Sequence, residues 1–144
     1  MVLVTDVFKA ISDSEALELF RIIALTKPDT PTIMSKIELS RKQYYLRMST
    51  LNKAGLIKRK NGKYNLSAFG RIIYNISLAT TENAVHNYWK FKAIDSVEMS
   101  YDLPTEQQKN LVDSLIDNQE FRDILYSDDM AAANQKYIDA AAEQ

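Results

Sequence analysis

Residues 40–66 read SRKQYYLRMSTLNKAGLIKRKNGKYNL, a pattern that predicts a helix followed at once by a tight hairpin. Ser40 and Gln43 form an S-x-x-Q capping box, which satisfies two amide donors at the start of a helix. Three side chains then recur at i, i+4 and i+7 and give this helix one apolar face: Tyr44, Met48 and Leu51. Gly55 suits the left-handed position that ends a helix.

The hairpin is predicted to turn at Asn61-Gly62, the strongest short-range signal for a two-residue type I′ turn. Its strands are expected within residues 56–60 and 63–66. The chain has eight basic residues and no acidic one between Ser40 and Lys63: Arg41, Lys42, Arg47, Lys53, Lys58, Arg59, Lys60 and Lys63. A cationic helix followed by a cationic hairpin is typical of a recognition helix and its wing.

The composition predicts a globular protein of one domain, or of one small domain with an elaboration. The chain has 144 residues, of which 46% are hydrophobic and 26% are charged. No apolar run approaches the roughly 18 residues of a membrane span, and the N-terminus MVLVTDVFKA does not resemble a signal peptide. The chain has no cysteine, which excludes disulfides and thiolate metal sites. We expect a cytoplasmic, nucleoid-associated protein that contacts no membrane.

The net charge of −1 conceals a strong asymmetry between the two halves of the chain. Residues 1–78 carry 13 Lys and Arg against 6 Asp and Glu, or +7, whereas residues 79–144 carry 5 against 13, or −8. Such asymmetry indicates a basic part for a polyanion and an acidic part for something else. We therefore expect a DNA-binding domain over residues 1–78 and a helical dimerisation or effector extension over residues 79–144. The alternative is a chance distribution of solvated charges.

Three helices are expected before residue 40. The first runs from Thr5 to Ile11, and the second begins at a cap on Asp13 or Ser14. The third is expected to be capped by Thr30, with Pro31 in its first turn. Together with the helix over residues 40–54, the third helix makes a helix-turn-helix.

Two segments, FKAISDSEALELFRIIAL and IMSKIELSRKQYYLRMSTLNKAGLIKRKNGKYNLSAFG, resemble the winged helix-turn-helix domain of small prokaryotic regulators. The ArsR-like and MarR-like families, in an archaeal form, are the nearest, and the resemblance covers roughly residues 5–78. It implies a mainly α fold with a small β-hairpin wing and a C-terminal helical extension, and pairing through helices outside the winged core. The metal-sensing cysteines of the ArsR type are absent, so heavy-metal sensing by thiolates is ruled out.

On a helical wheel, the polar face of residues 40–54 lies opposite the apolar face, and its N-terminal end is the part that a helix-turn-helix inserts into the major groove. Arg41 or Lys42 can donate to guanine, Gln43 can pair with adenine, and Tyr45 can contact a thymine methyl or a phosphate. The wing cations can reach the minor groove or flanking phosphates. The predicted DNA-binding residues are Ser40, Arg41, Lys42, Gln43, Tyr45, Leu46, Arg47, Ser49, Arg59, Lys60, Asn61 and Lys63. The alternative is a solvated helix face and a hairpin tip without a partner.

Downstream, Ser67 is expected to cap a helix in which Gly70 packs closely against a neighbour. Residues 79–82 predict either a new helix, capped by Thr80-Thr81, or one long bent helix. The segment ENAVHNYWKFKAIDSVEM then predicts an aromatic helix, whose dimerisation residues we expect to be Val85, Tyr88, Trp89, Phe91 and Ile94. The alternative is packing within the chain against the helix that contains Leu111–Ile116, and both can hold on different faces. Further helices are expected from Thr105, after Asn118 and in the tail from Asp128.

Catalysis finds little support, because His86 is the only histidine and three glycines make no phosphate-binding loop. No enzyme activity, cofactor or metal site is expected. The sequence predicts a dimeric, sequence-specific double-stranded DNA-binding transcription regulator, with a small-molecule or protein effector at the acidic half as a possible further partner. Two other functions stay open: a winged-helix module that binds proteins of the transcription machinery, and a nonspecific nucleoid protein.

Overall fold

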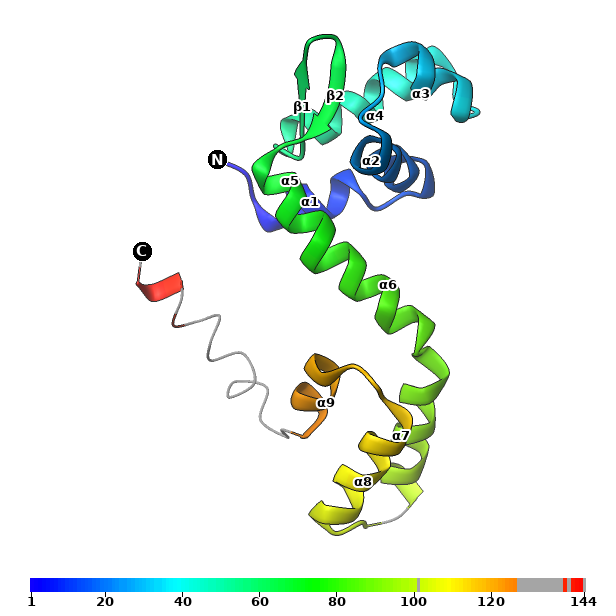
Figure 1. Cartoon of the computed structure of the whole chain (residues 1–144), viewed down its shortest axis with the longest axis vertical. Coiled ribbons are helices and arrows are strands. Elements are labelled where there is room, and N and C mark those ends of the chain that lie inside the picture. Colours follow the sequence, from blue (N-terminus) through cyan, green and yellow to red (C-terminus); the bar gives the residue numbers. More distant parts are fainter. Residues whose placement is uncertain (101, 127–138, 140, 144) are drawn as a thin grey trace. The chain divides into compact units, whose positions relative to one another are not determined.

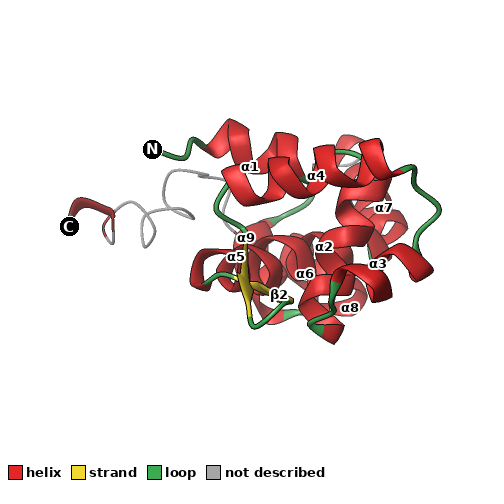
Figure 2. Ribbon diagram, turned by 90° about the horizontal axis from the view of Figure 1, so that it is seen from above, coloured by secondary structure: helices red, strands yellow, loops and turns green. Residues whose placement is uncertain are grey.

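The computed structural model describes residues 1–100, 102–126, 139 and 141–143 of the chain (Figure 1). These residues are mainly helical, and the strands among them form one antiparallel pair. Strands are yellow in Figure 2. A mainly helical protein with one hairpin is therefore confirmed. None of the described helices combines the length and the apolar character that crossing a bilayer would require.

The chain forms two compact units, which we describe separately. The first is Met1–Glu82 and the second is Asn83–Gln144, whereas the sequence predicted a division after residue 78. The elements that begin in the first unit are α1 (Val4–Ala10), α2 (Ser14–Thr26), α3 (Thr30–Lys36), α4 (Arg41–Lys53), β1 (Ile57–Lys60), β2 (Lys63–Leu66), α5 (Ala68–Ile72), the π-helical turn η1 (Ile73–Leu78) and α6 (Ala79–His86). Because α5, η1 and α6 follow one another without a break, Thr80-Thr81 caps no new helix, and the expectation of one long helix is the correct one.

The core of the first unit is built around α2 and the apolar face of α4. Leu19, Phe20 and Ile23 of α2 are completely buried. The three apolar side chains predicted for α4 are buried as expected: Tyr44 and Leu51 are 0% exposed and Met48 is 5% exposed. Since all three point inward, the polar and cationic side chains of α4 are left on its outer face.

Side-chain caps start α2, α3 and α4. The reciprocal capping box of Ser40 and Gln43 is present at α4, and Asp13 caps α2 by accepting the amide hydrogen of Ala16 at 2.7 Å. The predicted cap of α3 is wrong, because Asp29 and not Thr30 accepts the amide hydrogen of Thr32, at 2.9 Å. Asp29 stands one residue earlier and carries a carboxylate, which is a strong acceptor at the positive end of a helix.

The hairpin forms with the expected turn and with the register Ile57↔Leu66 to Lys60↔Lys63. Asn61 and Gly62 both have positive φ, 55° and 75°, as a type I′ turn requires. The segment before α3 also pairs with β2, since the amide of Tyr64 donates to the carbonyl of Pro28 at 2.8 Å. This backbone contact, which includes a bridge between Asp29 and Lys63, ties the hairpin to the start of α3.

The base of the hairpin is joined closely to α5. Ser67 caps α5 through the amide of Gly70 at 2.8 Å, and its hydroxyl donates to the carbonyl of Gly55. A Cβ on Gly70 would lie 1.9 Å from the carbonyl oxygen of Leu56. The close packing predicted for Gly70 is therefore confirmed.

The second unit contains α7 (Tyr88–Ser100), α8 (Thr105–Leu115) and α9 (Gln119–Tyr126). Four residues from these helices and their ends form its small core: Ile94, Val112, Ile116 and Phe121. The aromatic helix predicted over residues 82–99 is divided at Asn87, whose side-chain amide donates to the carbonyl of Asn83 at 2.8 Å. Such a bond offers the backbone an alternative to helical pairing. The predicted tail helix from Asp128 begins outside the described residues.

Candidate nucleic-acid interface

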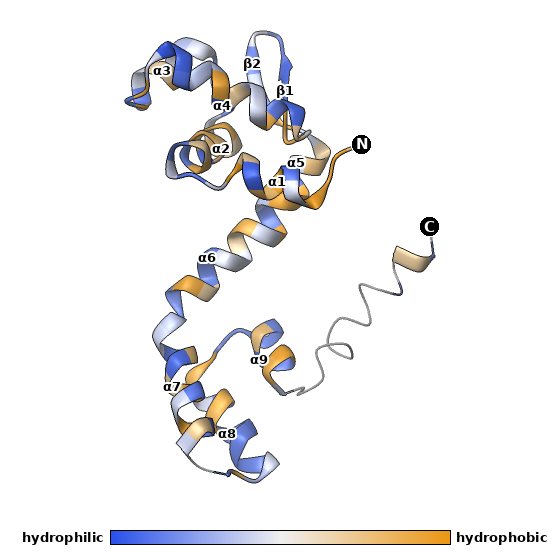
Figure 3. Cartoon of the chain, turned by 180° about the vertical axis from the view of Figure 1, so that it is seen from behind, coloured by the Kyte–Doolittle hydropathy of each residue, from blue (hydrophilic) through white to orange (hydrophobic). Residues whose placement is uncertain are grey.

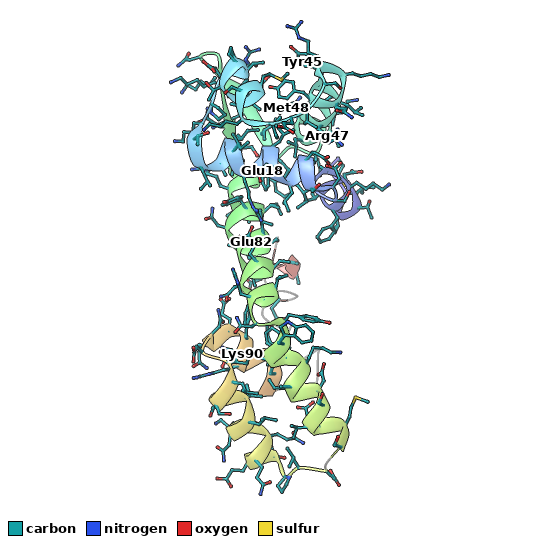
Figure 4. All side chains as sticks on the ribbon, turned by 90° about the vertical axis from the view of Figure 1, so that its right-hand side faces the viewer. Glu18, Tyr45, Arg47, Met48, Glu82 and Lys90 are labelled. Atoms are coloured by element: carbon teal, nitrogen blue, oxygen red, sulfur yellow. The ribbon has the colours of Figure 1, made fainter. Side chains whose placement is uncertain are left out.

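The outer face of α4 carries most of the predicted DNA-binding side chains. Tyr45 is 57% exposed and Leu46 is 65% exposed, although Met48 on the same helix is buried (Figure 4). The remaining exposed members of this face are Ser40, Arg41, Lys42, Gln43 and Ser49. Two cations, an amide and an aromatic ring are thus presented together near the N-terminal end of one helix.

Arg47 differs from the other predicted contacts because its charge is already paired. Its guanidinium lies 3.2 Å from the carboxylate of Asp13 and 3.6 Å from that of Glu15, and it donates to the carbonyl of Gln43 at 3.3 Å. Its side chain is only 20% exposed. Arg47 therefore ties α4 to the N-terminal end of α2, a pairing that no local sequence signal reveals.

The same contact affects the titration of Asp13. The hydrogen bond from the amide of Ala16 is the main cause that lowers the pKa of the Asp13 carboxyl, and the neighbouring Arg47 lowers it further. Burial acts in the opposite direction but does not prevail. Asp13 is thus held in its charged form, as both a helix cap and a counterion.

The hairpin tip forms the second group of predicted contacts, and Lys60, Asn61 and Lys63 are all exposed. The hydrophilic character of the tip is visible in blue in Figure 3. The guanidinium of Arg59 lies 5.5 Å from the ring centroid of Tyr64, so its position is partly set by a cation–π contact. The tip therefore offers exposed lysines and one oriented arginine.

Lys63 faces an acidic neighbour on the segment that pairs with β2. Hydrogen bonds from Thr32 are the main cause that lowers the pKa of Asp29, and attraction to the Lys63 cation adds to them. The charge of Lys63 is consequently balanced in part, whereas no ion pair with Arg41, Lys42 or Lys60 is found among the described residues. Those three cations are the strongest candidates for phosphate contacts.

The electrostatic character of this surface follows from a long interval without carboxylates. The chain has no Asp or Glu between Glu38 and Glu82, and nine Lys or Arg stand in that interval. Acidic groups meet α4 and the hairpin only from other segments, at Arg47 and Lys63 as described above. A surface with such an excess of positive charge attracts polyanions.

The predicted dimerisation residues divide into two sets within the second unit. Val85, Tyr88 and Trp89 are 68%, 51% and 79% exposed, respectively. Ile94 is 3% exposed, and Phe91 packs edge-on against Phe121 with the ring centroids 5.9 Å apart. Ile94 and Phe91 thus complete the core of their own unit, whereas the other three are available for pairing.

Comparison of the chain with protein-family models, curated proteins and solved structures found no match. No group of three or more histidine and carboxylate side chains with the geometry of a metal site occurs in the part of the chain that the structure describes.

Proposed function

We propose that the first unit is a winged helix-turn-helix domain, and that the protein is a dimeric, sequence-specific regulator of transcription. The observation that carries this proposal is the exposed N-terminal face of α4, where Arg41, Lys42 and Gln43 stand together at the start of an interval without carboxylates that runs from Glu38 to Glu82. The hairpin that follows adds a second cationic element with the turn geometry of a wing. We propose further that the domain is related to the ArsR-like and MarR-like regulators that residues 5–78 resemble.

In this proposal, α4 lies in the major groove of B-form DNA, which is about 12 Å wide and admits a helix. Arg41 or Lys42 donates to O6 and N7 of guanine, and Gln43 pairs with N6 and N7 of adenine. Tyr45 contacts a thymine methyl or a phosphate. Arg47 stays with Asp13 and Glu15 and positions the helix, so it contributes less directly to base recognition.

The wing contributes more to the affinity for DNA than to the recognition of its base sequence. Lys60 and Lys63 contact phosphates or the edge of the minor groove, and each neutralised phosphate releases counterions. One helix and one hairpin read only a half-site, so two copies related by a two-fold axis bind a pseudo-palindrome. The exposed residues Val85, Tyr88 and Trp89 supply the pairing surface.

Selection of bound sequences from a random DNA library tests the proposal directly. We expect an enriched pseudo-palindrome, with half-sites about 10 base pairs apart or a multiple of that spacing. The double variant Arg41→Ala and Lys42→Ala should lose specific binding and keep its fold. The matched control, Lys36→Ala and Lys53→Ala, removes the same charge elsewhere and should retain most of the affinity. Equal losses in the two double variants would show that only net charge matters.

A second candidate function, a protein-binding module, is favoured by one observation. Tyr45 and Leu46 expose two large apolar surfaces side by side on α4, which a protein partner can also cover. Gel shifts at about 50 mM salt separate the possibilities, because phosphate contacts are strongest at low salt. Absence of binding there would favour the protein-binding module, and binding without sequence preference would favour a nonspecific nucleoid role.

A further inference from the structure

A polar cavity of about 380 Å³ opens in the first unit between the end of α2, the base of the hairpin and the helix that follows it. Three cationic side chains line it, one from each of these parts: Lys27, Lys58 and Arg71. The lining contains no carboxylate, and no ion pair of these three residues occurs in the described part of the chain. None of the lining residues belongs to α3 or α4, although Lys58, Asn65 and Leu66 belong to the hairpin.

The charge in this cavity is not balanced by the protein itself. The C-terminal end of α2 contributes a partial negative charge of only about half an elementary charge, against three full positive charges. Lys27 occupies that helix end with left-handed backbone, φ 47°, where glycine is the usual residue. The backbone conformation at this position favours glycine, but the residue there is a lysine.

The remaining lining supplies both polar side chains and apolar surface. Asn65 lies directly across the hairpin from Lys58, and Tyr74 and Asn75 follow Arg71 along the helix. The apolar part is lined by Ile23, Leu25 and Leu66. A lining that combines polar and apolar side chains, in a cavity of this size, is characteristic of a small-molecule site.

We propose that this cavity binds a phosphate-bearing small molecule with an apolar part, whose phosphate is held by Lys27, Lys58 and Arg71. Phosphate is the preferred anion because three cations and several amide or hydroxyl donors match its charge and its oxygens. The ligand would contact the end of α2, the hairpin and the helix that follows the hairpin at the same time. This site lies in the basic first unit, whereas the sequence had pointed to the acidic half for an effector. Phosphate binding here does not depend on the proposed function.

Titration of the full-length, ¹⁵N-labelled protein with sodium pyrophosphate at constant ionic strength tests this proposal. We expect saturable amide shifts around Lys27, Lys58 and Arg71, and affinity lower by about tenfold or more in the variant Lys58→Gln, Arg71→Gln. The charge-matched control Lys36→Gln, Lys53→Gln should change the affinity by less than about twofold. Equal losses in the two pairs, or shifts spread over all exposed cations, would overturn the proposal. If the first pair does not fold, Lys27→Gln alone decides by the same criterion.

A second titration with a short DNA duplex present identifies the source of the phosphate, since a DNA backbone carries the same group. Pyrophosphate that stays bound in the presence of the duplex supports a free small molecule. Displacement of pyrophosphate from these three cations would assign the phosphate to DNA and overturn the small-molecule source. If no duplex binds but pyrophosphate binds as expected, the proposed DNA function fails while the phosphate site stands.

Discussion

Helices α4 and α7 have the same length of 13 residues but use their apolar side chains in different ways. In α4, three large side chains are buried by the helix's own unit, and the outer face is polar and cationic apart from the exposed side chains of Tyr45 and Leu46. In α7, Ile94 alone is fully buried, and Tyr88 and Trp89 are exposed. The buried side chains fix α4 to its own unit, whereas Tyr88 and Trp89 leave aromatic surface on α7 that a second chain can cover.

The largest expected effect is a loss of stability that tests how α4 is packed in the first unit. Leu51→Ala removes a completely buried side chain from α4 and should destabilise the first unit by about 3 kcal/mol, through lost burial and a residual cavity. Leu46→Ala is the matched control, because Leu46 is on the same helix but 65% exposed, and it should cost less than about 0.5 kcal/mol. Urea unfolding followed by the amide signals of the first unit gives both values. Equal costs would show that α4 is not packed as described.

The next largest loss of stability is expected where the base of the hairpin packs against α5. Gly70→Ala places a Cβ 1.9 Å from the carbonyl oxygen of Leu56, so the backbone must shift, and we expect a loss of about 2 kcal/mol or more. Gly62→Ala meets no atom within 4 Å, but its φ of 75° makes alanine unfavourable by about 1 kcal/mol. Thermal unfolding of the two variants compares them. A more stable Gly70→Ala protein would contradict the close contact.

Sequence reasoning predicted α4, its capping box and the hairpin because each rests on neighbouring residues. The pattern of Tyr44, Met48 and Leu51 needs only helical periodicity, and Asn61-Gly62 needs only the turn's positive φ values. Arg47 shows the limit of this reasoning, because its partner Asp13 is 34 residues away. A local pattern marks a cation as exposed, but only the fold decides whether a distant carboxylate neutralises it.

The same limit appears at other long-range or context-dependent features. The backbone hydrogen bond between Tyr64 and Pro28 joins β2 to a segment whose sequence has no strand pattern. Arg21 forms an ion pair with Glu82, another pair of residues far apart in the sequence. The π-helical turn at Ile73–Leu78 has no signature in its residues that periodicity detects, since apolar side chains there fit an ordinary α-helix equally well.

The pairing surface of the second unit gives the third effect. If Tyr88 and Trp89 pack between two chains, Trp89→Ala should weaken dimerisation by about tenfold to thirtyfold, because a buried indole is a common hot spot. Tyr45→Ala removes an exposed aromatic residue from α4 and should leave dimerisation unchanged. Sedimentation equilibrium over a range of concentrations measures both. A protein that is monomeric at all concentrations would show that the exposed aromatic residues of α7 do not form a pairing surface.

The smallest expected effect concerns how Arg47 holds α4 to α2. The pKa of Asp13 lies below its ordinary value of 3.8, mainly because of the Ala16 amide and then because of Arg47. Arg47→Gln should raise this pKa only part of the way back, since the bond to the amide remains. Carbon-detected NMR titration of the Asp13 carboxyl measures the shift, and Lys53→Gln should leave the midpoint unchanged.

The sign of the pH dependence follows from this lowered pKa. A carboxyl with a lowered folded-state pKa stabilises the fold fully above about pH 3.8, and this stability is lost as the pH falls through the folded-state value. Because the Asp13 side chain is 49% exposed, screening limits the contribution of its pairing with Arg47 to about 0.5 kcal/mol or less. The difference in stability between the natural protein and Arg47→Gln should therefore shrink as the pH falls below 3.8. A difference that stays constant as the pH falls would show that Arg47 holds α4 by packing alone and not by its charge.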